Sequence, residues 1–295
     1  PDLLPYVADK NPNKQGKYLP GSRIPIVSED HLRKQRPDYV VILPWNLKAE
    51  IMEQLSYVRD WGGRFVTAVP ELQMASKNNT KRVLVTGAAG FVGKHCLPLL
   101  LDKGFEVHAA DVVIPENNLH DVCWHNADLL DVQKTDELIE SIRPTHLLHF
   151  AWYAKPSEYW NSVENIRWVE GSLRLLRAFH GTGGRRVVMA GTCAEYDWKY
   201  GYCSEEATPL APSTLYGACK NATQHVLKEY SKVTGLSSAW GRIFFLYGPF
   251  ENPCRLVPSV ILNLLSNKEA PCSHGRQIRD FLYVKDVAAA FVALL

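Results

Sequence analysis

Tyr216 and Lys220 are the residues whose types and spacing best suit acid–base chemistry in this sequence. Two residues four positions apart in a helix lie on one face, so a phenol and an ammonium would be neighbours. A free tyrosine has a pKa of about 10, and a shift of roughly three units, or about 4 kcal/mol, would bring it to neutrality. A nearby cation acts in that direction because it stabilises the phenolate. We expect Tyr216 to transfer a proton; the alternative is a solvated pair on a helix surface.

Thr192 offers a second hydroxyl for the same site. It follows a predicted strand at 186–190 and precedes Tyr216 by 24 residues. Ligands of open parallel sheets bind at the carboxyl ends of the strands, which is where Thr192 would lie. This placement favours the catalytic interpretation of Tyr216 over the surface pair.

A glycine-rich turn stands upstream, between a predicted strand at 82–86 and a predicted helix at 91–103. Its spacing is G-x-x-G-x-x-G rather than the more common G-x-G-x-x-G. Such a turn can hold a dinucleotide pyrophosphate on backbone N–H groups at a helix start, whereas glycines alone could form a flexible loop. The flanking strand and helix favour the phosphate site. The candidate cofactor contacts are Gly87, Gly90, Phe91, Val92 and Gly93.

Asp111 closes the next predicted strand, 105–110, and lies 18 residues after Gly93. A carboxylate about 20 residues after the glycine turn bonds the adenosine ribose hydroxyls in dinucleotide-binding folds. It would repel the 2′-phosphate of NADP, so the sequence favours NAD and leaves NADP open. The alternative for Asp111 is a strand-end turn. Asp128 and Leu129 could similarly hold the adenine edge, or form an ordinary loop.

Strands and helices alternate across residues 81–295, and the strand centres are apolar. This pattern is typical of α/β folds with a doubly wound parallel Rossmann sheet, buried on both faces. Pro98 does not fit the helix predicted at 91–103, because a proline inside a helix costs about 3 kcal/mol or forces a kink. The remaining predicted elements are strands at 145–150 and 237–243 and helices at 134–142, about 160–180 and 214–234.

An N-terminal block precedes this domain. In it, predicted strands at 38–44 and 64–69 flank a predicted helix at 46–61. That spacing predicts a βαβ crossover and hence a parallel pair of strands. The predicted division is a small partial α/β domain at 1–74, a short polar linker at 75–80 and a dinucleotide-binding domain at 81–295.

The composition argues against several classes of function. The net charge is +2 without a run of like charges, so neither nucleic acid nor an anionic membrane is an expected partner. No segment is apolar enough for a membrane span, and no signal-peptide pattern occurs. Seven cysteines without a C-x-x-C pair suit free thiols in the cytoplasm, and ten histidines without ligand spacing argue against a metal site. The start at Pro1 and the apolar helical pattern at 292–295 predict a piece cut from a longer polypeptide.

Five motifs occur in order along residues 81–295. They are Val83–Gly93, His149–Ala151, the Thr192…Tyr216-x-x-x-Lys220 set, Arg242–Pro249 and Arg279–Val284. Together they resemble the extended short-chain dehydrogenase/reductase superfamily, in its NAD-dependent epimerase/dehydratase branch acting on nucleotide sugars. The resemblance implies a catalytic triad of Thr192, Tyr216 and Lys220, with the turn glycines and Ala151 at the cofactor. It also implies that Arg279 binds the substrate diphosphate, for which a guanidinium is suited; an ion pair with Asp280 is the alternative.

The sequence departs from that family in ways that bear on the reaction. Cys193 and Ala194 stand where the family dehydratases carry an Asp-Glu pair, which argues against 4,6-dehydration. Glu195, one position later, could be recruited at the substrate or could be an exposed carboxylate at the strand end. Trp168 replaces the usual helix asparagine. The family's C-terminal substrate lobe is incomplete at Leu295.

Segments 6–21, 24–27 and 44–51 carry a second resemblance. They are similar to the C-terminal domain of S-adenosylmethionine-dependent sugar C-methyltransferases, over residues 1–73. The resemblance implies that the methyl-donor and zinc-binding parts of that family lie outside this match, so we expect no methyl transfer.

These observations predict an NAD(P)-dependent oxidoreductase, a 4-ketoreductase or an epimerase, that acts on a nucleotide-activated deoxysugar. Tyr216 would transfer the proton, Thr192 would bond the same oxygen, and Lys220 would lower the tyrosine pKa. The second resemblance favours the ketoreductase, because that methyltransferase family acts on keto sugars. The alternatives are a non-catalytic dinucleotide-binding scaffold and a methyltransferase remnant. A homodimer is left open.

Overall fold

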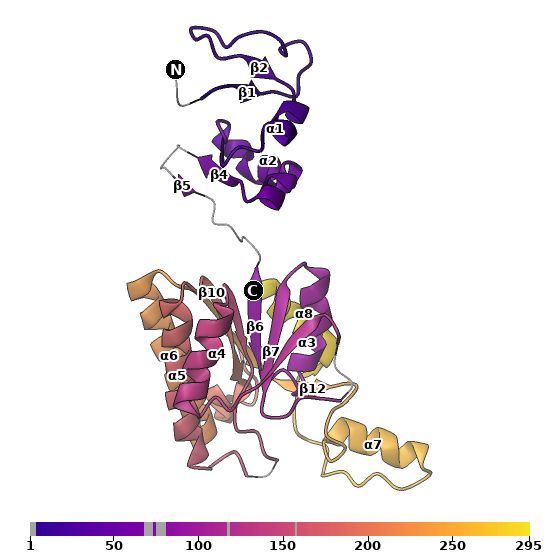
Figure 1. The fold of residues 1–295 in the computed structure, drawn as a ribbon. Coiled ribbons are helices and arrows are strands. Elements are labelled where there is room, and N and C mark those ends of the chain that lie inside the picture. The colour runs from indigo at the N-terminus through magenta and orange to yellow at the C-terminus, as the bar shows by residue number, and fades with distance from the viewer. Residues whose placement is uncertain (1–3, 68–72, 75–80, 117–118, 157) are drawn as a thin grey trace. The chain divides into compact units, whose positions relative to one another are not determined.

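The computed structural model describes residues 4–67, 73–74, 81–116, 119–156 and 158–295 (Figure 1). The chain forms two compact units, Pro1–Asn79 (unit 1) and Thr80–Leu295 (unit 2). The predicted linker at 75–80 lies outside the described residues and stays a prediction. Within the described part of the chain, no helix is both long and apolar enough to cross a membrane.

Unit 2 is built on a six-stranded parallel sheet with the order β11-β10-β9-β6-β7-β8. Its strands are β6 (Arg82–Thr86), β7 (Glu106–Asp111), β8 (Val122–Asn126), β9 (His146–His149), β10 (Arg186–Thr192) and β11 (Ser237–Ile243). The chain runs outward from β6 to β8 and then returns to β9 on the other side of β6. Ligands of such sheets bind at this reversal, outside the carboxyl ends of the strands. The predicted doubly wound parallel sheet is confirmed.

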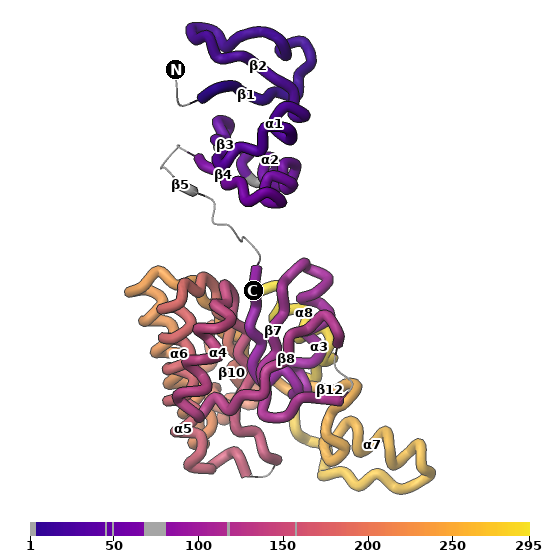
Figure 2. Tube along the Cα trace, in the orientation of Figure 1, coloured from indigo at the N-terminus to yellow at the C-terminus, as the bar shows by residue number. Residues whose placement is uncertain are grey.

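Helices cover both faces of this sheet (Figure 1, Figure 2). The helices are α3 (Gly93–Asp102) and α8 (Val284–Leu294) on one face, and α4 (Val132–Ile142), α5 (Glu164–Gly181) and α6 (Leu215–Thr234) on the other. Successive strand residues point to opposite faces. Val83 and Val85 of β6 therefore enter the α3–α8 core, whereas Leu84 enters the α4–α6 core.

Several elements of unit 2 do not follow from the hydrophobic pattern. β8 is not predicted, because Cys123 and His125 interrupt the apolar positions and only Val122 and Trp124 join the α3–α8 core. The other unpredicted elements are α7 (Leu256–Leu265), the short helices η3 (Cys193–Glu195) and η4 (Trp198–Tyr200), and the parallel pair β12 (Phe245–Tyr247) and β13 (Phe281–Tyr283). α7 has no buried residue and extends away from the sheet (Figure 1).

Pro98 stands within α3, inside the helix predicted at 91–103 despite the cost of an interior proline. A proline cannot donate to the carbonyl four residues earlier, which is that of Lys94. Pro98 is exposed, so the missing bond falls on the outer side of the helix and not in the core.

Unit 1 is small, and five buried side chains form its core: Leu32, Ile42, Met52, Val58 and Phe65. β3 (Tyr39–Val41) pairs in parallel with β4 (Arg64–Thr67), as the predicted crossover requires, and residues 68–69 of the second predicted strand lie outside the described part. The single helix predicted at 46–61 is wrong. The segment consists of η1 (Trp45–Leu47), α2 (Lys48–Gln54) and η2 (Ser56–Trp61), which ends at Gly62 with φ 83°. The unit also contains β1 (Val7–Ala8), β2 (Ile26–Val27), α1 (Glu29–Gln35) and β5 (Gln73–Met74).

Candidate active site

α6 carries Tyr216 in its first turn. Thr214 caps this helix, because its side-chain oxygen accepts the Gly217 N–H at 3.1 Å. A Cβ on Gly217 would collide with the carbonyl oxygen of Ala194. The start of α6 is therefore packed closely against the segment that follows Thr192.

Tyr216 and Thr192 meet at the carboxyl end of β10. Their side chains are close enough for the Thr192 hydroxyl to lower the pKa of Tyr216, and Thr192 is 7% exposed. The ring of Tyr216 also packs edge-to-face against Tyr159, with centroids 4.9 Å apart. The structure brings together the two hydroxyls that the sequence places at this site.

Burial raises the pKa of Tyr216 above its usual range, and the neighbouring Thr192 hydroxyl only partly opposes this. In this arrangement burial dominates, and the pKa is not shifted toward neutrality. The expectation that Lys220 and the nicotinamide together lower it stays a prediction. A raised pKa keeps the phenol protonated at neutral pH, which suits Tyr216 as a proton donor.

Lys220 is only 4% exposed. Its Nζ donates to the carbonyl oxygen of Ala190 at 2.8 Å and lies 3.9 Å from the centroid of the Trp152 ring. Burial lowers the pKa of Lys220 to about 7, and the negative charge of Glu195 acts in the opposite direction. Lys220 can therefore change charge near neutral pH.

Glu195 is fully buried, so its interpretation as an exposed carboxylate is wrong. Oε1 accepts the backbone N–H of Thr192 at 2.8 Å, which completes a capping box with the Thr192 side chain. Oε2 accepts from Nε of Arg242 at 2.7 Å, and the Trp240 indole N–H lies 3.1 Å and 3.2 Å from the two oxygens. These bonds occupy the carboxylate, and Glu195 fixes Thr192 rather than extending toward a substrate.

The glycine turn between β6 and α3 is closed by backbone contacts. Gly87 has φ 66°, and a Cβ there would lie 2.7 Å from the backbone nitrogen of Ala151. The Gly90 N–H donates to the Gly87 carbonyl at 3.1 Å, and a Cβ on Gly93 would collide with that carbonyl oxygen. Side chains are therefore excluded at Gly87 and Gly93. The bare turn at a helix start fits a dinucleotide pyrophosphate.

Asp111 ends β7 beside this turn. Its Oδ2 accepts the N–H of Ala89, within the turn, at 3.0 Å, and its Oδ1 accepts the Val112 N–H at 2.8 Å. The carboxylate thus reaches the glycine turn, as the ribose interpretation requires, and also stabilises it. Phe91 and Val92, in the turn just before α3, are half-buried, and Val92 packs against the α3–α8 core.

Asp128 and Leu129 follow β8. Oδ1 of Asp128 accepts the Leu130 N–H at 2.9 Å, which forms an Asx turn. The Leu129 side chain is 5% exposed and belongs to the α4–α6 core. Because the side chain is buried, Leu129 could contact an adenine only through its backbone.

Arg279 lies in the segment between α7 and β13. Its guanidinium stands over the rings of Trp198 and Phe245, at 5.4 Å and 4.9 Å from their centroids. In the described part of the chain no ion pair joins Arg279 to Asp280 or to another carboxylate, so that alternative is wrong. Burial raises the pKa of the Cys193 thiol to about 11, and the charge of Arg279 is among the weaker opposing influences.

Trp152 and Asn165 belong to the site although no motif points to them. The indole N–H of Trp152 donates to Oδ1 of Asn165 at 2.8 Å, and Asn165 is fully buried. The ring of Trp168 lies 6.3 Å from that of Trp152. Asn165 precedes Trp168 by about one helical turn, and that spacing is the signal that could have indicated it.

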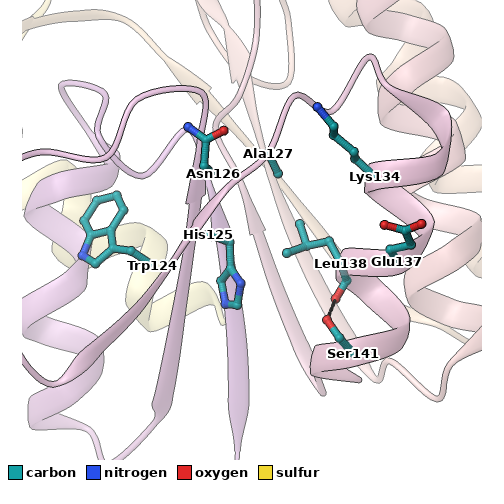
Figure 3. Close-up of a pocket in the computed structure, with 8 residues that line it drawn as sticks. All are labelled: Trp124, His125, Asn126, Ala127, Lys134, Glu137, Leu138 and Ser141. Carbon is teal, nitrogen blue, oxygen red and sulfur yellow. Dashed lines mark hydrogen bonds between the residues drawn. The ribbon is translucent and has the colours of Figure 1, made fainter.

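An open groove of about 580 Å³ lies between β8 and α4 (Figure 3). It is lined by Trp124, His125, Asn126, Ala127, Lys134, Glu137, Leu138 and Ser141. None of the candidate site residues lines it. β7, β6 and β9 separate β8 from β10, so the groove is distinct from the Tyr216 site.

Comparison with known proteins agrees with this geometry. The model of the NAD dependent epimerase/dehydratase family matches residues 83–295. The chain belongs to this family. Residues 1–70 match the model of the C-methyltransferase C-terminal domain. Both resemblances that the motifs indicate are thereby confirmed.

The relatives of this family member include several enzymes of nucleotide sugars. UDP-glucuronic acid decarboxylase 1 of Xenopus tropicalis is 29% identical, over 78% of this chain and 57% of its own length. A probable dTDP-glucose 4,6-dehydratase of Sinorhizobium fredii is 28% identical, over 71% of this chain and 66% of its own length. The chain thus spans less than two thirds of these relatives. The solved UDP-glucose 4-epimerase of Thermus thermophilus, in complex with NAD, aligns with a TM-score of 0.62 at 32% identity, over 72% of this chain and 74% of that chain.

Proposed function

We propose that unit 2 catalyses the NAD-dependent oxidation or reduction of a nucleotide-activated sugar. The observation that carries this proposal is the neighbouring pair of hydroxyls of Tyr216 and Thr192 at the carboxyl end of β10, with Lys220 one turn further along α6. Membership of an NAD-dependent family supports the cofactor, and the UDP- and dTDP-sugar names of the relatives support the substrate class.

In this proposal Tyr216, Thr192 and Lys220 each have a separate role in proton transfer. NAD, when bound, supplies or accepts the hydride. Tyr216 donates its proton to the keto oxygen of the sugar, and the Thr192 hydroxyl bonds that same oxygen, so that both stabilise the developing alkoxide. Lys220, when charged, compensates the tyrosinate that remains after the proton has left.

Within this class we favour a 4-ketoreductase, with an epimerase as the second candidate. The raised pKa of Tyr216 favours the protonated phenol, which reduction of a ketone consumes. Cys193 and Ala194 provide no carboxylate for removing water, and Glu195 is bound to Arg242. The match of unit 1 to a C-methyltransferase domain, from a family that acts on keto sugars, also supports the reductase.

The same geometry suggests how the chain would hold its ligands. Gly87, Gly90 and Gly93 would contact the pyrophosphate through their backbone, and Asp111 would bond the adenosine ribose and disfavour the 2′-phosphate of NADP. Arg279, which has no carboxylate partner in the described residues, would bind the diphosphate of the sugar nucleotide.

The test is the Tyr216→Phe variant, assayed for NADH oxidation with a panel of nucleotide-activated keto sugars. Without the acid, turnover should fall by about 100-fold or more. NAD affinity, measured by calorimetric titration, should stay as in the wild type. Tyr202→Phe is the matched control, because Tyr202 is 72% exposed and its loss should change neither quantity.

Each alternative function gives a different result. Turnover of Tyr216→Phe at the wild-type rate would refute the assignment of the acid. A wild-type chain that binds NAD but turns over no keto sugar is a dinucleotide-binding scaffold. Binding of S-adenosylmethionine would instead support a methyltransferase role for unit 1.

A further inference from the structure

The ammonium of Lys220 lies against an aromatic face. Its Nζ is 3.9 Å from the centroid of the Trp152 ring and 6.0 Å from that of Trp240. Among the described residues it makes one hydrogen bond, to the Ala190 carbonyl oxygen, although an ammonium carries three N–H groups. Because Lys220 is 4% exposed, water contributes little, and the π face of Trp152 adds to the stabilisation that the charge of Glu195 provides.

Trp152 is itself held in one orientation. The Nδ2 group of Asn165 donates to the carbonyl oxygens of Tyr159 at 2.7 Å and Ser162 at 2.8 Å. With both N–H groups committed, Oδ1 of Asn165 is turned toward the indole N–H of Trp152. The ring that contacts Lys220 is therefore anchored at its polar atom.

We propose that Trp152 is a positioning residue for Lys220: its ring, fixed by Asn165, holds the ammonium at the carboxyl end of β10 and favours its charged form. The proposal deepens the proposed function and rests on it where it connects Lys220 with proton transfer by Tyr216. The contact with the ring itself does not depend on the reaction.

Several titratable groups also face Lys220, and their effect on its pKa must be separated from that of Trp152. Glu195, in the turn after β10, raises the pKa of Lys220, and Arg242 of β11 pairs with Glu195. His149 of β9 is neutral at physiological pH, because burial and the charge of Lys220 lower its pKa to about 3. Tyr216, on the same helix, is protonated. Trp152 is uncharged, so replacing it leaves all these charges in place.

The experiment is a direct titration of Lys220 by NMR, with 13Cε-labelled lysine in the full 295-residue chain and without cofactor or substrate. Lys220→Met identifies the signal, and the wild-type signal should titrate near 7. Trp152→Leu removes the π face and should move the midpoint down by about one pH unit. Trp152→Phe keeps a smaller face and should move it by about half as much. Trp168→Leu, the matched control, should leave it unchanged.

An unshifted midpoint in either folded Trp152 variant overturns the proposal, and Trp152→Phe decides the matter if Trp152→Leu does not fold. An equal shift in Trp168→Leu also overturns it, because general loosening of the site would then be the cause. The alkaline limb of the kcat–pH profile should move down with the midpoint, since activity is lost where Lys220 loses its charge. A shifted midpoint with an unshifted profile would refute the role of Lys220 in the proposed reaction and leave the positioning by Trp152 intact.

Discussion

The two parts of the proposed site are held in place by different means. The turn after β6 is fixed by main-chain packing. Gly87 and Gly93 stand where a Cβ would meet main-chain atoms, and Asp111 accepts a backbone N–H of the turn. The end of β10 is instead fixed by side-chain contacts. The buried carboxylate of Glu195 binds the Thr192 N–H and the guanidinium of Arg242 on the neighbouring strand β11.

Because they are held differently, the glycine turn and the end of β10 should respond differently to amino-acid substitution. A backbone-built turn has no side chain that can relax, so an added methyl group must displace main chain. A side-chain-built site depends on partners far apart in the sequence, since Arg242 lies 47 residues after Glu195. We therefore expect abrupt loss of cofactor binding in the first part, and loss of stability together with altered titration in the second.

Gly93→Ala should give the largest effect, because its Cβ would collide with the Gly87 carbonyl and come 2.9 Å from the Cα of Ala88. NAD affinity should fall by about 100-fold, equivalent to roughly 2.7 kcal/mol, by calorimetric titration. The free energy of unfolding should fall by about 1–3 kcal/mol in urea, from overpacking. The control is Gly181→Ala, at a position with nothing within 4 Å of the new Cβ. Unchanged NAD affinity in Gly93→Ala would remove the turn from the cofactor site.

The same contrast explains what could be predicted from the sequence. β6, the glycine turn and Asp111 follow from local rules, namely strand pattern, glycine spacing and distance along the chain. The burial of Glu195 does not, because Arg242 comes from a separate strand and only the fold brings it close. The raised pKa of Tyr216 does not follow from them either, since it comes from burial by tertiary neighbours.

Local rules also fail where tertiary contacts replace the expected pattern. β8 is an edge strand whose outer positions need not be apolar, so its sequence does not resemble a buried strand. In unit 1, the apolar spacing at 46–61 suits one helix, yet the chain forms three short pieces around a core of five side chains. Pattern alone does not show where such a segment must bend to close a small core.

Glu195→Gln tests the side-chain part with an intermediate effect. The variant keeps the shape but removes the charge that pairs with Arg242, whose side chain is 18% exposed. The free energy of unfolding should fall by about 2–3 kcal/mol, somewhat less than for a fully buried pair. In the same variant the pKa of Lys220 should move further down, because the charge of Glu195 raises it.

Asp136→Asn is the control for that change. It breaks an ion pair with Arg174 in which both side chains are about 40% exposed, and such pairs contribute about 0–1 kcal/mol. Urea unfolding of the two variants should therefore differ clearly. Equal and small losses would mean that the end of β10 is not held by Glu195.

Asp111→Asn should have the smallest effect, and it separates the two roles of this residue. The amide keeps the size of the carboxylate but retains one acceptor oxygen for two N–H donors, Ala89 and Val112, so about 1 kcal/mol of stability should be lost. Removing the negative charge should shift the ratio of NAD to NADP affinity toward NADP by about tenfold. Asp121→Asn changes the net charge equally at an exposed position and should leave the ratio as it is. If Asp111→Asn loses stability while the ratio stays constant, Asp111 stabilises the turn and does not select the cofactor, and the glycine turn is then fixed by its backbone without a contribution to cofactor choice.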